Sequence, residues 1–380
     1  MKAHHLRGLT LHLGCGLLLL TGQLLWAASS RGRWTEAHAW TYMSQQPWPV
    51  GSNYLPKDAI NQLEMFQKDT YDPAEIDKEF GWAESAGMTT MRIFLHDLLW
   101  QQDSRGFEDR VDNVLSIAAR HHIKPVLVLF DSCWDPRPVP GPQHPPIPGV
   151  HNSGWVQSPG VALGDPAQIP RFKAYVAGIV GRFAHDNRIL AWDVWNEPDN
   201  PGGGDYKNLP NKVQLVDRLL PQVFDWARSV DPVQPLTSGV WTHDDWADPQ
   251  AWSATERIQL TQSDIISFHD YSWPEKFEAR LVSLEKLHRP ILCTEYMARG
   301  AGSTVDTILP IAARHHVGAI NWGFVQGKMQ TYLPWDSWQI PYVNRQPTVW
   351  FHDLFYPDGT PYRRREIELI RSLSMQMNKR

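Results

Sequence analysis

Two glutamates stand where apolar runs of the sequence end, and they are the first candidates for chemistry. Glu197 lies in AWDVWNEPDN, residues 191–200, between Asn196 and Pro198, and Glu295 lies near the end of ILCTEY. A short apolar run that stops at a carboxylate is typical of a buried strand that brings a polar side chain to the edge of a sheet. Two carboxyl groups that converge among aromatic side chains can cleave a glycosidic bond, because one protonates the leaving oxygen and the other attacks or activates water.

Tryptophan is the unusual residue of the composition, with 19 in 380 residues. Several tryptophans stand beside Pro, Asp or Gly rather than inside apolar runs, as Trp134 does in SCWDP. Packing in the core and in loops accounts for part of them. The others suit a cleft lined with flat apolar faces, which match the C–H faces of sugar rings, so Trp134 is a candidate for binding a carbohydrate substrate.

The elements that must position these residues repeat eight times along the chain. Strands are predicted at 50–54, 89–95, 125–130, 191–195, 236–240, 265–269, 291–295 and 318–322. Helices are predicted at 74–86, 111–121, 167–185, 211–229, 246–260, 275–287, 304–316 and 364–374. Buried parallel strands that alternate with helices predict an α/β protein, a single (β/α)8 TIM barrel. The Pro- and Gly-rich stretch 135–170 is predicted to be one of its long βα loops, which walls the C-terminal face.

The predicted barrel decides which residues can meet. Functional side chains of such barrels collect at the C-terminal ends of the strands, where the βα loops begin. Glu197 and Glu295 end the fourth and seventh strands, and strands three positions apart face each other across an eight-stranded barrel. We therefore expect the two carboxyl groups to converge above its centre.

These motifs resemble those of a known group of enzymes. WNEP at the end of the fourth strand and ILCTEY at the seventh look like the retaining glycoside hydrolases of clan A, of the cellulase-like family 5 type. The resemblance extends over about residues 42–362. It implies that Asn196 hydrogen-bonds the sugar 2-hydroxyl, that Glu197 is the general acid/base and that Glu295 is the nucleophile.

The resemblance covers further residues of the predicted site. FHDY implies that His269 lies in the substrate site and that Tyr271 hydrogen-bonds the nucleophile. Arg92 in MRIF looks like the arginine that keeps the nucleophile ionised, and Trp322 in INWGF resembles the tryptophan that floors the central sugar subsite. The chain departs from the group after the third strand, where FDSCWDP replaces a His-rich element. The departure leaves the sugar and the linkage open.

The composition and the N-terminal segment indicate the partners and the location of the protein. The net charge of −5, without a basic run, argues against a nucleic-acid partner. Lys2 and Arg7 precede an apolar run and then small residues, which predicts a signal peptide over 1–28 and a secreted or periplasmic protein. Residues 29–380 are then the catalytic domain. No later segment is apolar enough to span a bilayer, so no stable membrane insertion is expected. We expect a monomer whose two remaining cysteines stay separate thiols.

Metal and other catalytic chemistries fit the sequence less well. The adjacent histidines 121–122 and 315–316 end predicted helices and point in different directions, so we expect solvated helix ends rather than metal ligands. A G-x-S-x-G elbow and a P-loop lysine are absent from the sequence. No metal or cofactor is therefore expected.

The sequence thus predicts a secreted retaining β-glycoside hydrolase that cleaves a polysaccharide or oligosaccharide by double displacement. A glycan-binding barrel that does not cut its ligand is one alternative, although binding needs tryptophans and not paired carboxylates. A transglycosidase is the other, because it uses the same covalent intermediate.

Overall fold

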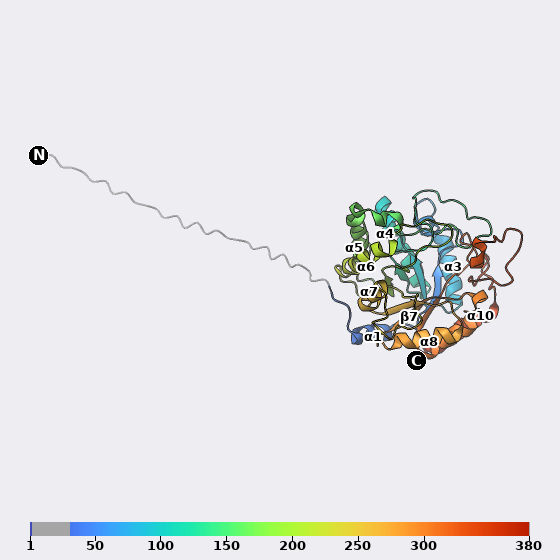
Figure 1. Ribbon diagram of the computed structural model, residues 1–380. Coiled ribbons are helices and arrows are strands. Elements are labelled where there is room, and N and C mark those ends of the chain that lie inside the picture. The colour runs from blue at the N-terminus through green and yellow to red at the C-terminus, as the bar shows by residue number, and fades with distance from the viewer. Residues whose placement is uncertain (2–30, 380) are drawn as a thin grey trace.

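Eight parallel strands form the centre of the molecule, with helices packed around them (Figure 1). The computed structural model describes residues 1 and 31–379, so the predicted signal peptide lies outside the described residues apart from Met1. The strands are β1 (Val50–Tyr54), β2 (Thr90–Phe94), β3 (Val126–Val128), β4 (Ala191–Asp193), β5 (Leu236–Thr237), β6 (Ile266–His269), β7 (Ile291–Tyr296) and β8 (Gly318–Asn321). Each corresponds to a predicted strand.

The strands close into a ring. Their order in the sheet is β5-β4-β3-β2-β1-β8-β7-β6, and β1 pairs with β8, with Gly51 opposite Ile320. A parallel bridge between Val240 and Phe268 connects the segment after β5 to β6 and completes the circle. The expected (β/α)8 barrel is therefore confirmed.

The helices alternate with the strands, as expected. They are α1 (Glu36–Ser44), α2 (Gln62–Phe66), α3 (Pro73–Ser85), α4 (Asp97–Arg120), α5 (Ile169–Arg182), α6 (Lys212–Arg228), α7 (Ala254–Gln262), α8 (Pro274–Glu285), α9 (Val305–Arg314) and α10 (Arg364–Asn378). The start of α3 follows from its cap, because Asp72 accepts hydrogen bonds from two backbone N–H groups of the first turn.

The structure corrects two predicted helix boundaries and adds two helices, α1 and α2. The predicted helix 111–121 starts at Asp97 and is kinked at Asp103, and the predicted helix 246–260 starts only at Ala254. No periodic pattern predicts α1, in which only Ala39 is buried. Ala39 and Trp34 pack against buried side chains at the beginnings of several strands, so the α1 segment closes the N-terminal end of the barrel.

The expectation for the histidine pairs is wrong for the first residue of each pair. The side chain of His121 is only 18% exposed, because its Nε2 lies 3.0 Å from Asp77 and its Nδ1 lies 2.9 Å from Glu84, both on α3. His315 is held in the same way by two carboxylates of α8. Both histidines follow the helix α4 or α9 within the same sequence, AARHH. They therefore join neighbouring helices.

Two further expectations concern the described part of the chain. Cys133 and Cys293 are both free, as predicted. Among residues 31–379, no helix is long and apolar enough to cross a bilayer.

Candidate active site

The two glutamates reach the mouth of the barrel from different backbone positions. Glu295 is the fifth residue of β7, whereas Glu197 follows β4 by four residues, at a φ angle of 43° that non-glycine residues adopt rarely. Pro198 then directs the chain away from the strand. Both side chains are largely buried, with Glu197 7% and Glu295 5% exposed. The fold therefore places both carboxyl groups over the centre of the barrel.

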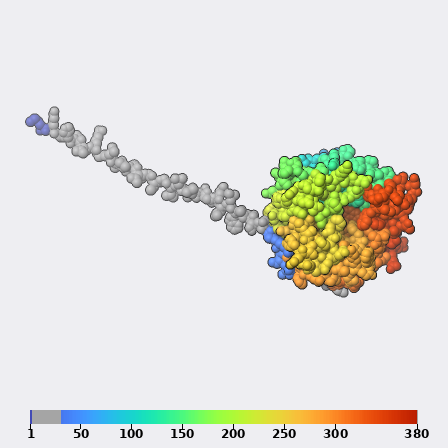
Figure 2. Space-filling model, viewed as in Figure 1, coloured from blue at the N-terminus to red at the C-terminus, as the bar shows by residue number. Residues whose placement is uncertain are grey.

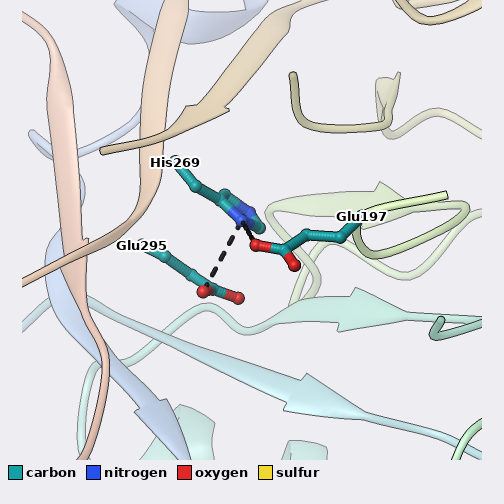
Figure 3. A group of neighbouring side chains, drawn as sticks. All are labelled: Glu197, His269 and Glu295. Atoms are coloured by element: carbon teal, nitrogen blue, oxygen red, sulfur yellow. Dashed lines mark hydrogen bonds and ion pairs between the residues drawn. The ribbon is translucent and has the colours of Figure 1, made fainter. Parts of the chain in front are cut away.

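His269, at the end of β6, lies between the two carboxyl groups (Figure 3). Its Nδ1 atom is 2.8 Å from Glu197 Oε1 and 3.5 Å from Glu295 Oε2. One oxygen of each carboxyl group and a ring nitrogen of His269 lie within 4.8 Å of one another. Burial lowers the pKa of His269 to about 4, so above that pH the neutral ring carries a single N–H.

Glu295 is in direct contact with a cation. Arg92, which is fully buried in β2, donates from Nη1 to Glu295 Oε1 at 2.9 Å. The Tyr271 hydroxyl donates to Glu295 Oε2 at 2.7 Å. Arg92 Nη2 also donates to Asp193 at 2.8 Å and to Asn196 at 2.7 Å, which fixes the guanidinium in place. Both oxygens of Glu295 are therefore held by donors that stabilise a negative charge.

Glu197 has different partners. Asn200 Nδ2 donates to its Oε2 at 2.6 Å, and the Cys133 thiol lies 3.2 Å from the same oxygen. Burial raises the pKa of both Glu197 and Glu295. Arg92 lowers the pKa of both carboxyl groups, but its direct contact is with Glu295 and favours the charged form of that group.

The carboxyl pair lies in a cavity of about 680 Å³, within the range for small-molecule sites. Five tryptophans line this cavity, namely Trp134, Trp155, Trp241, Trp322 and Trp335. The structure brings most of the predicted site residues together here: Asn196, Glu197, His269, Tyr271, Glu295, Trp322 and Trp134 all line the cavity. Arg92 lies beneath the carboxylates instead of at the cavity surface, so it can act only through them.

Sequence reasoning missed several side chains of the cavity. Asn200 stands three residues after Glu197, within the stretch 191–200, and this spacing could have identified it. Cys133 occupies the segment in which the sequence departs from the resembling enzymes. Asn152 comes from the long loop after β3, which has no periodic pattern and so offered no signal.

Glu197, His269 and Glu295 are close enough to bind a metal ion. The oxygens of both carboxylates already have hydrogen-bonding or ion-pair partners, and the Arg92 cation contacts one of them. This arrangement fits proton transfer between side chains better than it fits a metal cage, in which carboxylate oxygens face the ion.

Fold and site together define a parallel eight-stranded barrel with a buried carboxylate pair in an aromatic mouth. No protein-family model and no curated protein sequence matches this chain. Solved structures do share its fold. The β-1,4-mannanase from the common sea hare Aplysia kurodai is 19% identical, with a TM-score of 0.52 over 72% of this chain and 87% of that chain.

Two further structures extend the comparison. The exo-β-1,4-mannosidase Op5Man5 from Opitutaceae bacterium strain TAV5 is 20% identical, with a TM-score of 0.56 over 87% of this chain and 60% of that chain. A variant of GH5_18 from Streptomyces cattleya, in complex with Manb1-4GlcNAc, is 12% identical, with a TM-score of 0.57 over 87% of this chain and 80% of that chain. At these identities the likeness shows a common fold, the barrel that the sequence motifs predicted.

Proposed function

We propose that this protein is a retaining β-glycoside hydrolase with Glu295 as the nucleophile and Glu197 as the general acid/base. The observation that carries the proposal is the asymmetric carboxyl pair, in which one oxygen of each group lies within 4.8 Å of the other while only Glu295 contacts Arg92. Retaining enzymes need carboxyl groups about 5–5.5 Å apart, whereas inverting enzymes need about 6.5–9.5 Å to admit a water molecule. The short separation supports retention.

In the first step, a carboxylate oxygen of Glu295 attacks the anomeric carbon of the substrate. The bond from this carbon to the leaving oxygen breaks, and Glu197 transfers its proton to that oxygen. The product of the step is a glycosyl ester on Glu295 and a free alcohol. Arg92 and Tyr271 hold the carboxylate of Glu295 in place while it attacks and becomes a neutral ester.

In the second step, Glu197, now ionised, takes a proton from a water molecule. The hydroxide oxygen attacks the anomeric carbon and displaces Glu295, which restores both carboxyl groups to their starting states. Two inversions give a product with the anomeric configuration of the substrate. His269 and Asn200 orient Glu197 in both steps through its two oxygens.

For the substrate, we propose β-linked mannosides of a polysaccharide or oligosaccharide. The support is the fold shared with proteins described as a mannanase and a mannosidase, together with the tryptophan-lined cavity. We also propose that the protein is exported, on the basis of the signal peptide that the sequence predicts.

Hydrolysis of 4-nitrophenyl β-mannoside, with β-glucoside, β-xyloside and β-galactoside for comparison, tests the activity directly. Proton NMR of the early reaction mixture tests the stereochemistry, and a first-formed α-anomer would refute retention. A 2-deoxy-2-fluoro β-mannosyl fluoride should form a stable ester on the peptide that contains Glu295, detected by mass spectrometry. Labelling of another residue would reject the assigned nucleophile.

A further inference from the structure

The order of the strands divides the cavity into two sides. Going around the ring from β7 to β4 in one direction passes β8, β1, β2 and β3, and in the other direction passes β6 and β5. A sugar stacked on Trp322, which follows β8, lies on the first side. Its leaving group, protonated by Glu197, then lies on the second side, over Trp241 and Thr242. The first side is therefore the glycone side and the second the aglycone side.

The lining residues differ in exposure. On the aglycone side, Thr242 is exposed, and Trp241 and Ser272 are partly exposed. On the glycone side, Asn152 and Trp155 are both buried, with 1% and 2% of their surface exposed, whereas Trp335 of the loop after β8 is 41% exposed. A substrate can therefore extend from the aglycone side into solvent.

Trp155 and Trp322 close the glycone side from below. Their ring centroids are 5.7 Å apart at an angle of 70°, and both rings pack edge-on against Phe94. The space behind them, bordered by Leu55 and Met329, measures only about 10 Å³. Such a space holds at most about one water molecule. A second sugar ring cannot continue past the two tryptophans in this direction.

Two long loops are joined beside the glycone side of the cavity. Residues 149–152 of the loop after β3 are joined to residues 329–342 of the loop after β8, and Figure 2 shows teal-green residues meeting orange-red ones at this rim. The hydrogen bonds are Asn152 N to Met329 O at 2.8 Å, His151 N to Ser337 Oγ at 2.9 Å and Tyr342 N to Gly149 O at 2.8 Å. Backbone groups tied in this way form a fixed wall.

Asn152 is the polar group of that wall. Its side-chain Oδ1 and Nδ2 are both buried and neither has a hydrogen-bond partner in the structure, although the residue lines the cavity. An unsatisfied buried amide costs about 1–3 kcal/mol per group, so a ligand that pairs with it gains from the contact. One acceptor and two N–H donors suit a pair of neighbouring sugar hydroxyls.

We infer that the glycone side of the cavity holds a single terminal sugar, so that the enzyme removes one residue at a time from the non-reducing end, and that Asn152 recognises the hydroxyls of that sugar. This inference rests on the proposed glycosidase function. It specifies the substrate as a chain end that enters a blind pocket, with the rest of the chain leaving over Trp241 and Thr242.

A labelled oligosaccharide tests the end selectivity. With β-1,4-mannopentaose that carries a fluorophore at its reducing end, the first products should be the labelled tetrasaccharide and free mannose in equal amounts. A 4,6-O-benzylidene acetal on the non-reducing terminal sugar should abolish cleavage and, in the Glu295→Gln variant, binding. The inference would be overturned by early release of labelled di- or trisaccharide. It would also be overturned if the capped chain were cleaved or bound as well as the uncapped chain, or if the variant bound neither chain. If the wild-type protein had no activity on any aryl β-glycoside, the proposed function itself would be rejected.

Substitutions of Asn152 test the recognition. The φ angle of this residue is 50°, so Asn152→Gly removes the amide without backbone strain, and Asn152→Asp keeps its size. Both should lower kcat/KM for the preferred aryl β-glycoside about 10- to 100-fold. The preference over the glycoside epimeric at one contacted hydroxyl should fall as well. The matched control is Asn344→Gly, at an exposed residue of the loop after β8, which should behave as wild type. If both variants lost kcat/KM equally on the two epimeric glycosides, the role of Asn152 would be merely structural.

Discussion

Arg92 Nη1 lies 2.9 Å from Glu295 Oε1, and this ion pair distinguishes the surroundings of two otherwise similar buried carboxyl groups. The arginine is also held by Asp193, whose Oδ2 lies 2.8 Å from Arg92 Nη2. Glu197 is held instead by neutral donors, the amide of Asn200 and the thiol of Cys133. A cation beside one carboxyl group and neutral donors beside the other suit the proposed nucleophile and general acid.

The first prediction concerns the two glutamates. Glu295→Gln should abolish turnover of every substrate, because no other carboxylate can form the ester. Glu197→Gln should reduce kcat/KM for an unactivated glycoside by about 10²–10⁴-fold, the contribution of general acid catalysis. Formation of the ester from a 2,4-dinitrophenyl glycoside should be much less affected, since this leaving group needs no proton. Pre-steady-state rates with both substrates measure the difference, and equal losses in both variants would contradict the assignment.

The second prediction concerns the pH profile. Activity requires ionised Glu295 and protonated Glu197, so kcat/KM should be bell-shaped, with the acidic limb from Glu295 and the alkaline limb from Glu197. The Tyr271 hydrogen bond lowers the pKa of Glu295 against the effect of burial, which raises it. In Tyr271→Phe, the acidic limb should therefore move to higher pH while the alkaline limb stays nearly in place. A shift of the alkaline limb alone would reverse the roles.

The third prediction concerns Cys133. Burial raises the pKa of Glu197, whereas the hydrogen bonds from Asn200 and Cys133 lower it. Cys133→Ala removes one of these bonds, so the alkaline limb of the profile should move to higher pH. Cys133→Ser keeps a donor and should shift the limb less. The variant Cys293→Ala, in β7, is a control for the loss of a buried thiol.

The fourth prediction concerns His315 and stability. Burial lowers the pKa of this histidine, but hydrogen bonds to Glu278 and Glu285 raise it overall. The stabilisation is then fully present below the unfolded pKa of about 6.5 and is lost as pH rises through the folded pKa. His315→Gln should therefore lower Tm more at pH 6 than at pH 9. The neighbouring, solvent-exposed His316→Gln serves as a control, and an equal decrease at both pH values would argue against the ion pairs.

The fifth prediction concerns Trp322. Only 8% of its surface is exposed, and it packs on Phe94 and Trp155, so it contributes to folding as well as to the cavity. Trp322→Ala should cost about 3–5 kcal/mol in the free energy of unfolding and should also raise KM. Trp322→Phe should retain more of the stability than of the sugar binding. Denaturant unfolding and steady-state kinetics separate the two effects.

The barrel was predictable because its elements carry strong local signals. The run from Val126 to Val128 and the capped start of α3 at Pro73 are recognisable without tertiary information. The start of α4 at Asp97 was missed because the helix is kinked at Asp103, which divides its pattern. The α1 helix was missed because a single buried residue, Ala39, gives no periodic pattern.

Only those residues of the candidate site that lie at the ends of strands could be predicted from the sequence. The positions of Glu197 and Glu295 follow from the strand pattern, and their proximity follows from the barrel. The position of Asn152 depends on contacts with Met329, nearly 180 residues later in the chain, and no local pattern encodes such a contact. Cys133 could not be assigned because its segment has no counterpart in the resembling enzymes.

The hydrogen bonds between the loops after β3 and β8 also set an order for assembly. Gly149 and Gln330 are 181 residues apart in sequence, so contacts of this kind close only after most of the chain has been synthesised. A nascent chain that ends before residue 318 already carries both glutamates, but it lacks β8, Trp322 and the second loop. Such a chain lacks part of the proposed sugar site. The proposed site is therefore complete only when residues 318–342 have joined the loop after β3.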